Sequence, residues 1–135
     1  MGTSITFPGI PAIVPAARRF VRGILEGSPC HADCELIAGE LISNAIRHTP
    51  AGDDGGAFTV TIRTAPGWAR IEVSDPGTGQ WHPLSTVDDD DEAEYGRGLA
   101  IVGALAGKFG HDAGTSGQTV WAEVTWDSEL REGSP

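Results

Sequence analysis

The chain of 135 residues is poor in the features that mark secreted, membrane and disulfide-rich proteins. It has two cysteines, no run of about 18 consecutive apolar residues, and no basic start followed by an apolar stretch. We therefore expect neither a transmembrane helix nor a secretory signal, and the expected location is the cytoplasm. The length suffices for a hydrophobic core without disulfide or metal staples.

Positive charge is scarce as well. Nine Lys and Arg residues stand against nineteen Asp and Glu residues, which gives a formal net charge of −10. Such a surface repels the phosphates of nucleic acids, so a general DNA- or RNA-binding role is disfavoured. The inference is mainly negative, because acidic surfaces also occur in proteins with no special partner.

The two cysteines, Cys30 and Cys34, flank a histidine and could suggest a metal site. Their spacing matches no standard zinc pattern, and a second pair of ligands is missing. We expect instead that Cys34 packs in a helix core and that Cys30 lies near the start of that helix.

Glycine is abundant: the chain has nineteen, about twice the usual share of about 7%. The glycines gather between periodic segments, which favours turns and a backbone that approaches a ligand closely. The size predicts one domain over 1–135, with a core over about 5–125 and a frayed tail over 127–135. The aperiodic, partly acidic segment 76–95 is long for a connection and predicts a lid or a disordered loop.

Hydrophobic periodicity, proline and glycine divide the remainder into helices and strands. We expect a strand over 4–7, helices over 16–26 and 28–48, strands over 57–64 and 69–74, a helix over 97–107, a short strand over 108–111 and a strand over 118–126. Helices and strands do not alternate regularly. The order predicts an α+β fold, a two-layer sandwich of a mixed, mainly antiparallel sheet with helices on one face.

The second predicted helix carries the first chemical motif. At 100° per residue, Glu40 and Asn44 lie about 40° apart and Arg47 falls beside Glu40, which makes a polar stripe along the edge of the apolar face. Asn is unfavourable inside a helix, and an amide beside the core needs partners. If the motif stood alone, a core-edge Asn bonded to backbone, with Glu40 in solvent, would be the simpler interpretation.

A second motif follows the 69–74 strand, where Asp75 precedes Gly77 and Gly79. An ionised carboxylate only accepts hydrogen bonds, so Asp75 suits the exocyclic amine of adenine, whereas guanine presents an oxygen there. The glycines allow a base to lie close to the backbone. An ordinary strand-to-turn exit would have the same residues.

A third motif, Gly96-Arg97-Gly98-Leu99, opens the 97–107 helix. Free backbone N–H groups at a helix start bind anions, and a guanidinium suits phosphate oxygens. A flexible helix start with a solvent-facing Arg97 is the alternative. The P-loop, dinucleotide-binding, nucleophile-elbow and zinc-protease motifs are all absent from the sequence.

Together these motifs resemble the GHKL ATP-binding superfamily, which has the Bergerat fold. Glu40 and Asn44 match its N box, the Asp75 segment matches its first glycine box, and Gly96-x-Gly98 matches its second. Thr119 matches a hydroxyl that supports adenine binding. In its small size and in the sequence around Arg47, His48 and Leu99, the chain looks most like the anti-sigma-factor serine/threonine kinase branch, in its actinobacterial form.

The resemblance implies ATP beneath the 76–95 lid and Mg²⁺ held by Asn44 and the phosphates. It implies that Glu40 orients or deprotonates the attacking hydroxyl, and that Arg97, Gly98 and Leu99 contact phosphates. It implies that His48 shapes the site or caps the helix. The expected partners are an STAS-type anti-sigma-factor antagonist, as the phosphorylated substrate, and a sigma factor; homodimers are usual in that branch.

Two other functions stay open at this stage. The chain could be a catalytically weak or inactive ATP-binding module that regulates by holding a partner. The acidic run 88–92 would weaken the binding of polyanionic ATP if it faced the ligand, although a solvated run is the simpler interpretation. An ATPase part of a larger machine is disfavoured, because the sequence shows no transducer domain.

Overall fold

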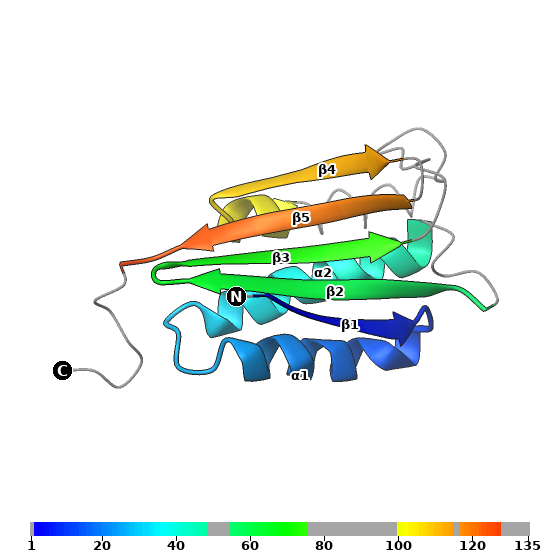
Figure 1. Ribbon diagram of the computed structural model, residues 1–135, viewed down its shortest axis with the longest axis horizontal. Helices are drawn as coiled ribbons and strands as arrows, with labels where there is room; N and C mark the ends of the chain where they lie inside the picture. The colour runs from blue at the N-terminus through cyan, green and yellow to red at the C-terminus, as the bar shows by residue number, and fades with distance from the viewer. Residues whose placement is uncertain (1, 49–54, 76–99, 115–116, 128–135) are drawn as a thin grey trace.

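The computed structural model describes residues 2–48, 55–75, 100–114 and 117–127. Five strands form one sheet in the order β1-β2-β3-β5-β4, and every neighbouring pair is antiparallel (Figure 1). The strands are β1 (Gly2–Pro8), β2 (Ala57–Ala65), β3 (Trp68–Asp75), β4 (Lys108–Gly114) and β5 (Gly117–Thr125).

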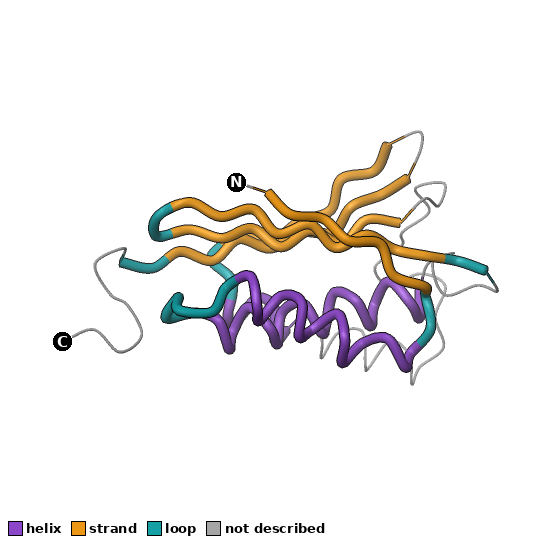
Figure 2. The backbone as a smooth tube through the Cα atoms, turned by 60° about the horizontal axis from the view of Figure 1, so that its bottom comes forward, coloured by secondary structure: helices purple, strands orange, loops and turns teal. Residues whose placement is uncertain are grey.

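The helices lie on one face of this sheet, as Figure 2 shows. They are η1 (Pro11–Ile13), α1 (Val14–Ile24), α2 (His31–His48) and a helical segment over 100–105. α1 packs against α2, and α2 packs against β3 and β5. The described part therefore confirms the expected α+β sandwich, with helices in one layer and an antiparallel sheet in the other.

Alternation along the strands builds the core. In β2 and β3, buried and partly exposed residues alternate, so one side chain in two points toward the helices. Burying an aliphatic side chain contributes about 1.5–3 kcal/mol. The fully buried side chains with the largest volumes are Phe58, Ile37, Leu41, Ile42, Ile62, Ile71, Val21, Val60, Val102 and Cys34.

The expected boundaries differ from the observed ones by a few residues. Pro15 lies in the first turn of α1, where a missing N–H costs nothing, so this helix begins before the expected Ala16. β4 continues beyond His111 to Gly114, because it pairs with β5 along its whole length. The start expected for the 97–107 helix lies outside the described residues.

Both cysteines have the places expected of them. Cys34 is fully buried on α2, and Cys30 precedes the helix. Burial raises the pKa of the Cys34 thiol to about 12, and burial also raises the pKa of Cys30. The described residues hold no group of three or more His, Cys, Asp or Glu side chains that could bind a metal ion.

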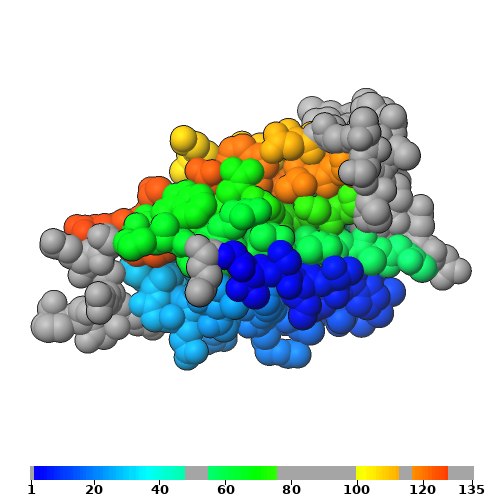
Figure 3. Space-filling view, viewed as in Figure 1, coloured from blue at the N-terminus to red at the C-terminus, as the bar shows by residue number. Residues whose placement is uncertain are grey.

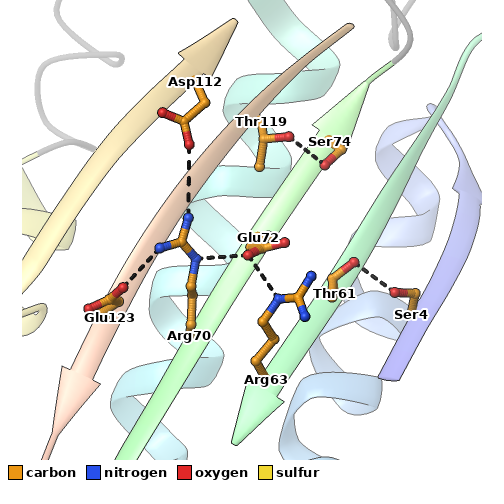
Figure 4. Close-up of polar contacts among 9 residues, drawn as sticks. All are labelled: Ser4, Thr61, Arg63, Arg70, Glu72, Ser74, Asp112, Thr119 and Glu123. Atoms are coloured by element: carbon orange, nitrogen blue, oxygen red, sulfur yellow. Dashed lines mark hydrogen bonds and ion pairs between the residues drawn. The ribbon is translucent and has the colours of Figure 1, made fainter. Parts of the chain in front are cut away.

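The other face of the sheet is covered by no described helix, and side chains of all the strands contribute to its surface (Figure 3). Arg70 lies at the centre of an ionic network there (Figure 4): its Nε is 2.7 Å from Glu72 and its Nη1 is 2.9 Å from Glu123. The hydrogen bond from Arg70 lowers the pKa of the Glu123 carboxyl. The guanidinium also stacks on Trp121, 4.2 Å from the ring centroid. These contacts tie β3 to β5.

None of the described helices has the length and apolar character needed to cross a lipid bilayer.

Candidate functional site

Three polar side chains are buried among the described residues: Asn44, Asp75 and Gln118, which are 7%, 7% and 3% exposed. They come from the last turns of α2, the last residue of β3 and the second residue of β5. Figure 1 shows that these three ends lie at the same end of the sandwich. Burying polar groups costs free energy unless they find partners, so their convergence indicates a site.

Strand register fixes the relation between Asp75 and Gln118. The two residues are directly opposite each other in the antiparallel β3–β5 pair, and Val73 lies opposite Val120 two positions earlier. Opposed residues have their Cβ atoms about 4.5–5.5 Å apart and share a face of the sheet. Because Val73 is buried in the core, Asp75 and Gln118 point to the helix-covered face.

Asn44 reaches this region from the helical layer. Its neighbours Leu41 and Ala45 are buried, so Asn44 lies at the inner side of α2 and not in solvent. Its Nδ2 atom is buried and has no hydrogen-bond partner within the described part of the chain. A buried donor left unpaired costs about 1–3 kcal/mol, so the amide lacks a partner that a ligand could supply.

The other sequence-predicted residues of α2 have mixed positions. Glu40 is half-buried one turn before Asn44, and Arg47 is exposed near the end of the helix. His48 is the last residue of α2. Glu40 and Asn44 therefore form the polar edge that the helical spacing predicts.

Thr119 lies on the opposite face of the sheet from Asp75. Its hydroxyl oxygen is 2.8 Å from Ser74 Oγ (Figure 4), and Ser74 is the residue opposite Thr119 in the strand pair. Neighbouring residues of a strand point to opposite faces. The side chain of β5 that shares the face of Asp75 is therefore Gln118, which sequence reasoning missed. The register of β3 against β5, which motif spacing does not reveal, would have found it.

Gln118 has a partner on the edge strand. The Nε2 atom of His111 on β4 is 2.9 Å from Oε1 of Gln118. His111 lies opposite Val120, which places it on the same face as Gln118. An amide and an imidazole thus stand next to the Asp75 carboxylate at the edge of the core.

The two glycine boxes do not belong to the described part of the chain. Gly77, Gly79, Gly96, Arg97, Gly98 and Leu99 lie outside the described residues, as do the expected lid and most of the expected tail. Their assignment to a phosphate-binding region stays a prediction from the sequence.

Comparison with known proteins defines the class. A family model described as a histidine kinase-like ATPase domain matches residues 7–124, which is most of the chain. The chain belongs to this family. The match includes Asn44, Asp75 and Gln118, and the GHKL resemblance read from the motifs is confirmed.

Among individual relatives, sensor protein DivL of Caulobacter vibrioides is 35% identical over 98 residues, which cover 62% of this chain and 12% of DivL. A crystal structure of the RsbU and RsbW domains of Rv1364c from Mycobacterium tuberculosis matches with a TM-score of 0.65 and 20% identity, over 93% of this chain and 32% of that one. The Acinetobacter baumannii histidine kinase AdeS matches with a TM-score of 0.50 and 16% identity, over 91% of this chain and 67% of that one. These structural likenesses support the fold.

The described residues fit a nucleotide with Mg²⁺ better than they fit a metal alone. Mg²⁺ prefers oxygen ligands and is usually held by one or two protein groups plus substrate phosphates and water. The side-chain oxygen of Asn44 is a ligand of this kind, whereas its Nδ2, the atom that lacks a partner, is a donor suited to a nucleotide oxygen. No denser protein cage is present in the described ranges. Asn44 fits that role.

Proposed function

We propose that the chain is an ATP- and Mg²⁺-dependent protein serine/threonine kinase of the anti-sigma-factor type, which acts in the cytoplasm. Its substrate would be an STAS-type anti-sigma-factor antagonist, and it would also bind a sigma factor, as a homodimer. The convergence of buried Asn44, Asp75 and Gln118 at one end of the sandwich carries the proposal. The residues of the motif around Glu40 support the kinase type. The fold shared with a structure that contains an RsbW domain supports it as well.

In this proposal the buried polar residues bind and orient the nucleotide. Asp75 accepts a hydrogen bond from the exocyclic amine of adenine, because an ionised carboxylate can only accept. The side-chain oxygen of Asn44 would hold Mg²⁺, which would neutralise phosphate charge. Arg47 and His48 would border the phosphates, and the sequence motifs of Gly77, Gly79 and 96–99 would supply backbone N–H donors.

Glu40 would serve the transfer itself. The hydroxyl oxygen of the substrate Ser or Thr forms a bond to the γ-phosphorus, and its proton passes to the Glu40 carboxylate. The bond between the γ-phosphorus and the bridging oxygen breaks, and the electron pair leaves with ADP. Glu40 is half-buried one helical turn from Asn44, and this nearness to the proposed Mg²⁺ ligand supports the role.

The test compares two half-buried glutamates of α2. Glu40→Gln should lower phosphoryl transfer at least about 100-fold while ATP affinity stays within about threefold. Glu35→Gln is the matched control, since Glu35 forms ion pairs with Arg18 and Arg22 on α1 instead. The measurement is transfer of label from γ-labelled ATP to each STAS-type antagonist encoded by the same organism.

The outcomes separate the alternatives. Equal transfer by the parent chain and Glu40→Gln would contradict the role of Glu40. ATP binding without any phosphorylated antagonist would contradict the kinase proposal and favour the regulatory module that acts by holding a partner. ATP hydrolysis without a phosphoprotein product would favour an ATPase part of a larger machine.

A further inference from the structure

We infer that Gln118, held in one orientation by His111, selects adenine over guanine in the proposed ATP site. This inference rests on the proposed function, because it concerns the same nucleotide. It goes beyond the sequence motifs, which indicate Asp75 and Thr119 and give Gln118 no role. The observation that carries it is the juxtaposition of Asp75, Gln118 and His111 on the inner face of the sheet.

The first step concerns burial. Gln118 is the most buried polar residue described, at 3% exposed, and it lies opposite Asp75 in the β3–β5 pair. A buried amide carries two donors and a carbonyl acceptor that all need partners. The bond to His111 accounts for the carbonyl oxygen. The NH₂ group is then the part of Gln118 that is suited to a ligand beside Asp75.

The second step concerns the base. Asp75 offers only acceptors, and a Gln118 amide in this orientation offers only donors. Adenine presents an exocyclic amine, a donor, next to a ring nitrogen that accepts, so it complements the pair at both positions. Guanine presents an acceptor oxygen next to a ring N–H donor and opposes both groups. Such discrimination is strong because the wrong base leaves buried polar groups without hydrogen-bond partners.

The third step concerns His111. An amide that is free to rotate by 180° can offer either its NH₂ group or its oxygen, so Gln118 alone would tolerate either base. When Nε2 of His111 carries a hydrogen, it donates to Oε1 of Gln118 and holds the NH₂ group toward the base. His111 is therefore a positioning residue, which acts on the base through Gln118.

The experiment is a calorimetric titration of ATP and GTP, each with Mg²⁺, into the whole chain and its variants. Gln118→Met retains length and volume without the amide. It should weaken ATP binding about fivefold to tenfold, the net value of about one hydrogen bond, and lower the ratio of ATP to GTP affinity. His111→Phe should change ATP affinity less than Gln118→Met does, but lower the ratio about fivefold.

Two further variants separate positioning from structure. His111→Lys retains a donor-only group and should restore most of the ATP preference that His111→Phe loses. Thr61→Val is the matched control, because Thr61 lies on the outer face of β2 and bonds to Ser4. It should leave both affinities unchanged. Thermal unfolding of each variant shows that it is folded.

An unchanged ATP to GTP ratio in both Gln118→Met and His111→Phe would overturn the inference. If Asp75→Asn still altered the ratio, the proposed nucleotide site would stand without Gln118. A parent chain that binds neither nucleotide would overturn both. Phosphoryl transfer is not measured in this titration, so a failed kinase assay would contradict only the proposed function.

Discussion

At the scale of single residues, the feature that matters most is a polar atom without a partner. Nδ2 of Asn44 is buried at the inner side of α2 and makes no hydrogen bond among the described residues. Proteins seldom retain such a group unless it serves a ligand, because the free chain is less stable for it. Under the proposed function, Asn44 would therefore lower the stability of the free chain and support nucleotide binding.

This opposition predicts the behaviour of Asn44→Leu. Without nucleotide, the variant should be more stable than the parent by about 1 kcal/mol, because the unpaired amide is replaced by an apolar group of similar size. Its Mg²⁺-dependent ATP binding should be lost. Urea unfolding and calorimetry, each with Mg²⁺ and with a chelator, measure the two effects.

The neighbouring Ser43, half-buried on the same helix, offers the control: Ser43→Ala should change stability by less than about 0.5 kcal/mol. Retained Mg²⁺-dependent binding in Asn44→Leu would contradict the metal role of Asn44.

At the scale of elements, β5 supplies Gln118 to the inner face, opposite Asp75, and Thr119 and Trp121 to the outer face. The edge strand β4 packs closely on it. A Cβ atom added to Gly110 would lie 2.8 Å from Cζ2 of Trp121, closer than real Cβ contacts allow. Arg70 stacks on that indole ring, so the ring cannot move freely.

Two glycine substitutions should therefore have opposite signs. Gly110→Ala should destabilise the chain by about 1–3 kcal/mol, since the Trp121 ring must shift. Gly23→Ala in α1 should stabilise it by about 0.5–1 kcal/mol, because Ala favours a helix and nothing lies within 4 Å of the new Cβ. Chemical denaturation measures both. A neutral effect of Gly110→Ala would show that β4 does not pack on Trp121 as described.

At the scale of the whole molecule, charge opposes the proposed ligand. The chain has a formal net charge of −10, and the nucleotide is also an anion. Burial of Asp75 adds a carboxylate to the site itself. Under the proposed function, affinity for ATP would therefore come from local donors and Mg²⁺, against a long-range repulsion that salt screens.

Salt should consequently speed association. Between about 20 and 200 mM NaCl, the association rate of Mg-ATP should rise about twofold to fivefold, because the Debye length shrinks. Stopped-flow measurement with a fluorescent ATP analogue gives this rate. Adenosine carries no charge and is the matched control, with a rate that salt leaves nearly constant. A rate for ATP that falls with salt would show that local positive charge dominates the approach.

Much of the fold was predictable because local signals agreed with each other. Apolar positions with a helical period along α2, and the alternation of Phe58, Val60 and Ile62, each indicate the element that forms. Prolines and glycines indicated where elements end. The ends of the elements were predicted less accurately. Pairing with β5 extends β4 to Gly114, and no local feature of the sequence indicates that pairing.

The elements, the family and the places of Glu40, Asn44 and Asp75 on their helix and strand could be read from the chain alone, because these depend on spacing within one helix or one strand. Which residue of β5 lies beside Asp75 on the inner face became known from the fold alone. Ser74 and Thr119 are 45 residues apart in the chain, and their pairing is set by packing across the whole sheet. A shift of register by one residue exchanges the two faces, so it would bring Thr119 instead of Gln118 to the inner face beside Asp75.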